Sequence, residues 1–272
     1  MDLNYVIEGS NLYIFKSFGR VTLHESHINA MIIKGHLYML KHLARCGFTF
    51  DHTHLDLALK HNQKYIIVWF WHLGIKPTSE GIDYAIKYNY SKLVKTYYQH
   101  HIVPTSAGAN YAAVNNNLKA LKWLSCLDPP IWPTREAANE VVKLKHWNLL
   151  QWLLQKHIYP TSDALEYLTQ KGQLKSLQYM FKHTRLRPSR KVANVAARNG
   201  HLHILQWLAS PILNNYRTVL PNEKGASDAA RFKHQAVVVW LLEKNIYPDV
   251  HGCNNLVTLG NLKLLKSLPI EP

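Results

Sequence analysis

Apolar residues recur along the chain at the spacing of short amphipathic helices. Val192, Ala193 and Ala196 fall on one face of a helix, and Leu205 and Leu208 fall on one face of a second helix shortly after it. Apolar residues three or four positions apart bury one side of a helix and leave the other side in water. The same double pattern returns along most of the chain, so the sequence predicts an all-α fold of paired short helices.

Seven prolines give this pattern its repeat length. They lie 27 to 33 residues apart, and a Thr or Ser, which caps a helix N-terminus well, follows five of them. Two short helices cannot bury their apolar faces alone, whereas stacked neighbours can. We therefore expect a solenoid of about nine helix–turn–helix repeats over residues 24–272, starting near residues 24, 51, 78, 105, 134, 161, 189, 222 and 249. The prolines are Pro77, Pro104, Pro133, Pro160, Pro188, Pro221 and Pro248.

Two stretches match a known repeat. NGHLHILQWL at residues 199–208 and KGHLYMLKHL at residues 34–43 resemble the centre of an ankyrin repeat. A unit of about 27 residues that ends in proline is similar to the short ankyrin variant common in large DNA viruses and in protists. The resemblance covers residues 24–272 and implies an ankyrin-like solenoid that binds other proteins. The genomes that carry such repeats also suggest a structural role in a viral particle.

Two regions depart from the repeat. Residues 1–23 form either a hairpin that turns at residues 8–11 or a degenerate helical unit, and we expect them to cap the array. The repeat at 189–221 carries about six extra residues, around 210–220, and the repeat at 105–133 carries two. Insertions in solenoids map to loops on one face, often a functional one. Drift between duplicated units explains them equally well.

Position 19 of the repeat, in the second helix, is aromatic in six units. Exposed side chains there would form a ladder that stacks on nucleic-acid bases. Flanking apolar positions place them instead at the edge of the buried stripe, and burial of a Trp is strongly stabilising. The pattern favours burial. These residues are Trp69, Trp123, Trp152, Tyr179, Trp207 and Trp240.

The charge of the chain points to an anionic partner. The formal net charge is +15 and the isoelectric point is about 9.6, which suits an acidic protein, nucleic acid or an anionic membrane surface. Cations recur at repeat position 10 or 11, and equivalent positions stack in a solenoid. A cation in the last turn of a helix also offsets the helix dipole without any ligand. The candidate binding residues of this basic stripe are Lys60, Lys87, Lys143, Lys171, Arg198 and Arg231.

Further lysines lie at positions 15 and 18, early in the second helix. A cation is mildly unfavourable there, so the helix dipole does not explain them. They favour a functional basic surface. The lysines are Lys92, Lys119, Lys175 and Lys263 at position 15, and Lys41, Lys95, Lys122 and Lys266 at position 18.

No motif for chemistry is visible. The 17 histidines lack zinc-binding spacing, the three cysteines form no CxxC pair, and the 17 carboxylates show no pair suited to acid–base work. No phosphate-binding loop or nucleophile elbow is present. We predict no enzymatic activity, no catalytic residue, no metal and no cofactor.

The sequence leaves the partner open among three hypotheses. The first is a protein–protein interaction scaffold that holds an acidic protein through its basic face. The second is a nucleic-acid-binding solenoid that uses the basic stripe, and the third is a structural component of a viral particle. No apolar run is long enough for a transmembrane helix, and the N-terminus lacks a signal-peptide pattern. We therefore expect an intracellular protein, cytoplasmic or nuclear, located in the host cell or virion if it is viral.

Overall fold

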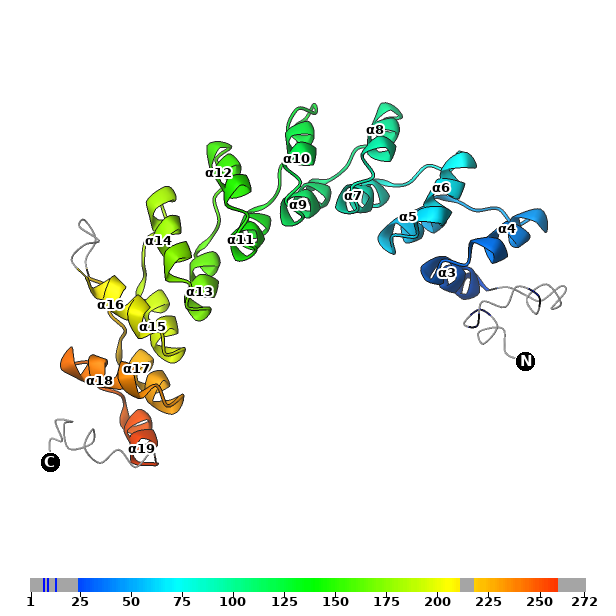
Figure 1. Ribbon diagram of the computed structural model, residues 1–272. Coiled ribbons are helices and arrows are strands. Elements are labelled where there is room, and N and C mark those ends of the chain that lie inside the picture. Colours follow the sequence, from blue (N-terminus) through cyan, green and yellow to red (C-terminus); the bar gives the residue numbers. More distant parts are fainter. Residues whose placement is uncertain (1–6, 8, 10–12, 14–23, 211–217, 259–272) are drawn as a thin grey trace. The chain divides into compact units, whose positions relative to one another are not determined.

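The computed structural model describes residues 7, 9, 13, 24–210 and 218–258. Most of the predicted cap at 1–23 and of the insertion at 210–220 lies outside these residues, as do Lys263 and Lys266. Over the described ranges the chain contains 17 helices and no strand (Figure 1). The prediction of an all-α helical-repeat solenoid is confirmed.

The helices alternate along the chain between the first and the second helix of a pair. The first helices are α3 (Glu25–Lys34), α5 (His52–Lys60), α7 (Ser79–Lys87), α9 (Ser106–Val114), α11 (Arg135–Lys143), α13 (Ser162–Gln170), α15 (Arg190–Arg198), α17 (Glu223–Arg231) and α19 (Val250–Thr258). The second helices are α4 (Leu37–Arg45), α6 (Lys64–His72), α8 (Ser91–Gln99), α10 (Leu118–Leu124), α12 (Trp147–Gln155), α14 (Leu174–His183), α16 (Leu202–Ala209) and α18 (Gln235–Glu243).

Polar side chains begin several of the first helices. Thr78, Thr105, Thr161 and Ser189 each precede a helix, and the hydroxyl oxygen of each accepts a hydrogen bond from a backbone N–H of the first turn. Asp51 does the same for α5 through its carboxylate. These N–H groups have no partner within their own helix, so the caps satisfy them and define where each helix begins.

A residue with positive φ lies in the turn between the two helices of each complete pair. Glycine adopts this conformation without a Cβ penalty, and asparagine tolerates it better than most residues. Glycine takes this place in three pairs, and asparagine or lysine takes it in the others. The residues are Gly35, Asn62, Asn89, Asn116, Lys145, Gly172, Gly200 and Lys233, with φ between 55° and 80°.

The chain divides into two compact units, Met1–Ala137 and Ala138–Pro272. In the first unit, helices α3, α5, α7 and α9 pack in a row, and in the second unit α13, α15, α17 and α19 do so (Figure 1). Second helices pack against the first helix of their own pair. Small side chains let neighbouring first helices approach closely, as shown by the fully buried Ala109, Ala112 and Ala113 of α9.

A polar side chain on six first helices accepts a hydrogen bond from the backbone N–H that begins the next pair. Asp83 Oδ1 accepts from the N–H of Thr105 at 2.8 Å, and Asn139 Oδ1 accepts from that of Thr161 at 2.8 Å. We call these residues the cap ladder, because each one joins two consecutive pairs in a defined register. The acceptors are Asp56, Asp83, Asn110, Asn139, Asn194 and Ser227, with N···O distances of 2.7–3.0 Å.

Candidate functional site

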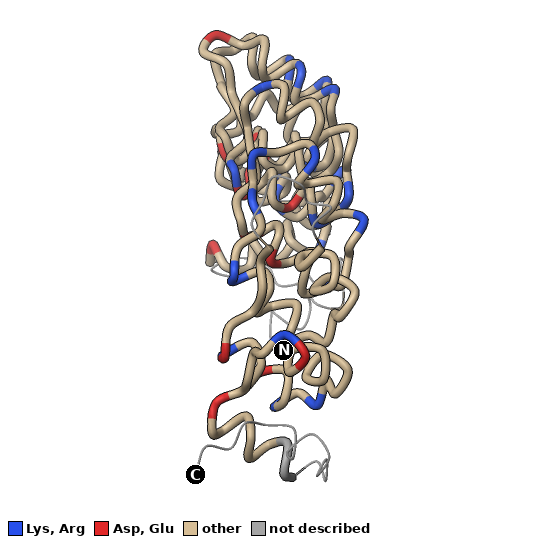
Figure 2. The backbone as a smooth tube through the Cα atoms, turned by 90° about the vertical axis from the view of Figure 1, so that its left-hand side faces the viewer, with Lys and Arg blue, Asp and Glu red and all other residues tan. Residues whose placement is uncertain are grey.

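The predicted basic stripe lies at the C-terminal ends of first helices. Lys60, Lys87, Lys143, Arg198 and Arg231 are the last residues of α5, α7, α11, α15 and α17, and Lys171 directly follows α13. Lysines and arginines recur along both units, and aspartates and glutamates are fewer (Figure 2). The location suits the helix dipole, so the dipole alone accounts for one cation at each of these ends. Whether the cations can also bind a ligand depends on the side chains that they contact.

In the first unit, Lys87 lies among three tyrosines. Its Nζ is 5.9, 5.2 and 5.2 Å from the ring centres of Tyr84, Tyr88 and Tyr111, within the range of cation–π attraction. The hydroxyl of Tyr88 donates to the carbonyl oxygen of Lys60 at 3.1 Å. Burial, aided by the hydrogen bond to Glu80, raises the pKa of Tyr84 to about 12. Tyr84 is therefore neutral at pH 7, and the cluster carries the positive charge of Lys87.

In the second unit, two rings each face two cations. Lys143 Nζ and Lys171 Nζ lie 5.4 and 5.9 Å from the centre of the Tyr167 ring. The guanidinium carbons of Arg198 and Arg231 lie 5.3 and 5.8 Å from the ring centre of Phe232. Each ring thus brings together cations from two neighbouring first helices, in an alternation of positive charge and aromatic surface.

An open groove of ≈ 700 Å³ lies over the first helices of this unit. Lys143, Tyr167, Arg198 and Phe232 line it, and Phe232 is 43% exposed, so its ring is accessible. Two carboxylates, Asp163 and Glu166, also line the groove, and Glu166 pairs with Lys191 Nζ at 2.7 Å. Outside the lining, Glu140 pairs with Lys143 Nζ at 2.7 Å. Such a surface can hold an anionic chain that also presents flat rings.

Sequence reasoning missed the aromatic partners of the stripe. They lie at repeat positions 7 and 11, within and just after the first helix. Position 7 is tyrosine in three repeats, which is the signal that a column-by-column comparison would have found. The partners are Tyr84, Tyr111 and Tyr167 at position 7, and Tyr88 and Phe232 at position 11.

The aromatic residues at repeat position 19, which we call the tryptophan column although one of them is Tyr179, lie on the second helices. Members of the column pack against other aromatic side chains. Trp123 meets Tyr98 edge-on at 5.5 Å between ring centres, and Trp207 stacks on Phe181 at 5.3 Å. Trp240 is only 9% exposed, and the other members are half-buried. The column therefore holds neighbouring pairs together at the edge of the core, as the burial interpretation predicted, and forms no exposed ladder.

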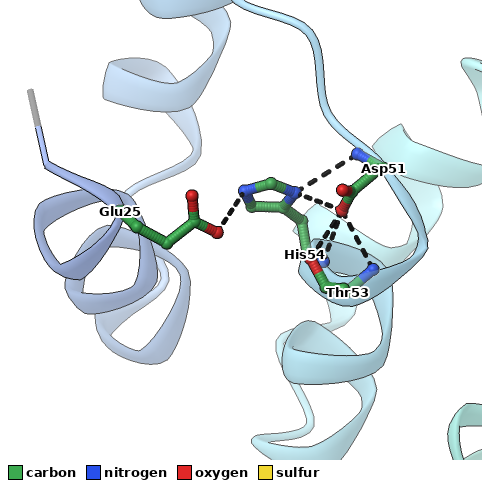
Figure 3. Close-up of polar contacts among 4 residues, drawn as sticks. All are labelled: Glu25, Asp51, Thr53 and His54. Atoms are coloured by element: carbon green, nitrogen blue, oxygen red, sulfur yellow. Dashed lines mark hydrogen bonds and ion pairs between the residues drawn. The ribbon is translucent and has the colours of Figure 1, made fainter.

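A histidine between two carboxylates joins the first two pairs (Figure 3). His54 Nδ1 lies 2.7 Å from Asp51 Oδ1, and His54 Nε2 lies 3.6 Å from Glu25 Oε1. The hydrogen bond from the Thr53 hydroxyl and the contact with His54 lower the pKa of Asp51 to about 2. His54 is 4% exposed, whereas the side chains of Asp51 and Glu25 are 56% and 66% exposed, so a buried imidazole links α5 to α3 between two solvent-exposed carboxylates.

The described residues form neither a metal-binding cluster nor a membrane-spanning helix. Nowhere in these ranges do three histidine, cysteine, aspartate or glutamate side chains gather in a way that could hold a metal ion. None of the helices they form is long and apolar enough to cross a membrane.

Comparison with known proteins identifies the class of fold. No family model and no curated protein matches the sequence. Among solved structures, the chain is similar to the pentatricopeptide repeat protein PPR10 in complex with an 18-nt psaJ RNA element, and to a triple cysteine-to-serine variant of it with the same RNA. In both cases the TM-score is 0.59 and the identity 12%, over 97% of this chain and 47% of the other, so this chain spans about half of the PPR10 chain. The likeness identifies this protein as a helical-repeat solenoid.

Proposed function

We propose that this protein is a non-enzymatic scaffold that binds single-stranded RNA over the ends of its first helices. The observation that carries the proposal is the pairing of cations with shared rings, Lys143 and Lys171 on Tyr167, and Arg198 and Arg231 on Phe232. Cations neutralise phosphates and aromatic rings stack on unpaired bases, which together suit a single strand better than a duplex.

The likeness to PPR10 supports this choice over an acidic protein partner. PPR10, a repeat protein of similar fold, forms a complex with an RNA element. The net charge of +15 suits a polyanion. Of the repeat classes, the short ankyrin variant remains our assignment: His201 Nε2 lies 3.0 Å from the carbonyl oxygen of Gln170 at the end of α13, a contact of the Gly-His motif with the preceding repeat. A viral origin and a place in the cytoplasm, nucleus or virion stay predictions from the sequence.

The test compares two triple charge reversals in the second unit. One variant changes Lys171, Arg198 and Arg231 to Glu, and the matched control changes the exposed Lys156, Lys182 and Lys244 to Glu. All six residues lie at or next to the C-terminal end of a helix, so both variants change charge and helix dipole alike. Binding to single-stranded RNA, duplex DNA and an acidic peptide is titrated at two salt concentrations.

We expect the stripe variant to lose RNA affinity by more than about tenfold, and the control by much less. The slope of log K against log salt should fall by about 2, since each lost phosphate contact removes about 0.7. Equal losses in both variants would mean that bulk charge binds RNA, which contradicts the proposal. Loss of acidic-peptide binding alone, in the stripe variant, would favour the protein-scaffold hypothesis instead.

The aromatic part of the proposal has its own test. Phe232→Leu keeps an apolar side chain beside Arg198 and Arg231 and removes the ring. Because stacking on a base requires a flat ring, affinity for single-stranded RNA should fall, by about 1–3 kcal/mol if one base stacks there. Affinity for duplex DNA should change little. Equal changes for both nucleic acids would remove base stacking from the proposal.

A further inference from the structure

Three of the second-helix lysines surround an apolar notch that the proposed RNA surface does not use. The notch lies between α8 and α10 in the first unit and has a volume of ≈ 190 Å³. Val94, Ala120 and Trp123 contribute to its lining, and Lys92, Lys95 and Lys119 belong to the same wall. The three lysines are exposed, so their charged ends can stay in water while their stems border the notch. We call this site the α8–α10 notch.

The notch exists because a large apolar residue is missing from one repeat. Ala120 occupies the position in the second helix where the neighbouring helices of this unit carry Met39, Ile66 and Leu93. Those three side chains are buried, whereas Ala120 is partly exposed. The shortened side chain leaves apolar surface open to solvent. Removing this surface from water lowers the free energy, so it favours the binding of a partner that covers it.

The charged residues in the lining of the notch are the three lysines, with no aspartate or glutamate among the lining residues. Residues 84–127 contain five lysines and no aspartate or glutamate. A segment with one sign of charge attracts the opposite sign. The occupant that fits is therefore anionic around an apolar part. The five lysines are Lys87, Lys92, Lys95, Lys119 and Lys122.

The polar groups at the rim indicate whether the apolar part is a base or a side chain. Asn117 Nδ2 donates to Asn89 Oδ1 at 3.1 Å, and Asn117 Oδ1 accepts from the backbone N–H of Ala120 at 3.0 Å. Ser91 also donates to Asn89, and Tyr90 donates to Asn62. These bonds use both amide oxygens and both hydroxyl protons, so the polar edge of a nucleobase would find fewer partners at this rim than it has in water. A purely apolar side chain has no such penalty.

We propose that the α8–α10 notch binds an acidic peptide segment of a partner protein, with one large apolar side chain inserted beside Trp123 and flanking carboxylates on Lys92, Lys95 and Lys119. This interaction surface lies mainly on second helices and borders the RNA surface, since its lining also includes Ile86 and Asn89 on either side of the stripe residue Lys87. One chain thus joins an RNA to an acidic protein.

The test fills the notch without changing its charge. Ala120→Leu restores the kind of side chain that the neighbouring repeats carry, so the variant is expected to fold. Ser176→Leu, at the same repeat position in the second unit, is the matched control. The probes are short fluorescein-labelled peptides with glutamates around one central Leu, Ile, Met, Phe or Trp, and the same peptides with the central residue changed to Ser or the glutamates to Gln. Fluorescence anisotropy gives the affinities.

At least one peptide should bind the native protein, and Ala120→Leu should weaken that binding by about tenfold or more, equal to about 1.4 kcal/mol. Ser176→Leu should leave it unchanged, and both peptide changes should abolish it. The variant with Lys92 and Lys119 changed to Glu gives a second reading that does not depend on packing. Failure of all five glutamate peptides to bind, or equal binding by Ala120→Leu, overturns the proposal. Loss of single-stranded RNA binding in Ala120→Leu would also overturn it, since the notch would then belong to the RNA surface.

Discussion

At the scale of the residue, the cap ladder shows how one repeat position takes different chemical forms, a carboxylate, an amide or, at Ser227, a hydroxyl. Asp56 and Asp83 use carboxylates where Asn110 and Asn139 use amides, and all four accept from a backbone N–H of the next pair. An amide can also donate, as Asn139 Nδ2 does to the Thr161 hydroxyl at 2.8 Å. Burial raises the pKa of Asp56 and of Asp83 above 3.8, despite the hydrogen bonds from Thr78 and Thr105 that act in the opposite direction.

Asp83→Asn should therefore stabilise the protein at neutral pH. A raised pKa means that the folded state holds the proton more tightly than the unfolded chain. The stability tied to Asp83 is thus present at low pH and falls as pH rises from 3.8 through the raised pKa. Urea unfolding should give the variant an advantage of about 1 kcal/mol or less at pH 7 and none near pH 3. The reverse change, Asn139→Asp, should destabilise at pH 7. Lower stability of Asp83→Asn at pH 7 would contradict this account.

Gly108 gives a second prediction at this scale. Replacing a helical glycine by alanine usually stabilises by about 1 kcal/mol. A Cβ at Gly108, however, would collide with Asp83 Oδ1 and lie 2.9 Å from Ile86 Cδ1. Gly108→Ala should instead destabilise by about 1–3 kcal/mol, because the buried Asp83 must shift. Thermal unfolding measures the sign, and an increase in Tm would show that the ladder tolerates a wider spacing.

At the scale of the element, second helices are held by an apolar stripe with an aromatic residue at its edge. Members of the tryptophan column differ in depth, from the half-buried Trp152 to Trp240 at 9% exposure. Since the free energy of burial scales with the apolar area removed from water, the column provides a graded series within one fold.

Trp240→Ala should lower the free energy of unfolding by about 3–5 kcal/mol, and Trp152→Ala by roughly half as much. The larger loss reflects the cavity that a buried ring leaves in α18. Urea denaturation of the two variants and the native protein measures both values. Equal losses would show that the half-buried ring contributes through specific contacts and not through buried area.

At the scale of the whole molecule, each helix pair is stabilised mainly by its contacts with the neighbouring pairs. Within the first unit, α5 packs against α3, α6 and α7, and α7 packs against α9. A stack of this kind behaves approximately as a sum of repeat and nearest-neighbour terms. Local unfolding in one pair therefore weakens its neighbours most and more distant pairs less.

Leu59→Ala removes a fully buried side chain from α5 and should destabilise by about 2–5 kcal/mol. Native-state hydrogen exchange should show the greatest loss of protection in α5 and α6, an intermediate loss in α3 and α7, and the smallest in α9. A uniform loss along α3–α9 would mean that the unit unfolds as a single cooperative block.

The sequence by itself determined the helices, their pairing and the place of the stripe cations at helix ends. Caps such as Thr78, turn residues such as Gly200 and the apolar spacing all act within one repeat, so their effects can be derived without knowing the neighbours. Only the tertiary structure decided which side chains of neighbouring repeats contact one another. Asp83 contacts Thr105, which lies 22 residues later in the chain. Phe232 is shared by Arg231 and by Arg198 of the preceding repeat. The notch beside Ala120 forms only because α8 packs next to α10. Such contacts follow from how closely and at what angle two helices pack, which the volumes of side chains from both repeats set together.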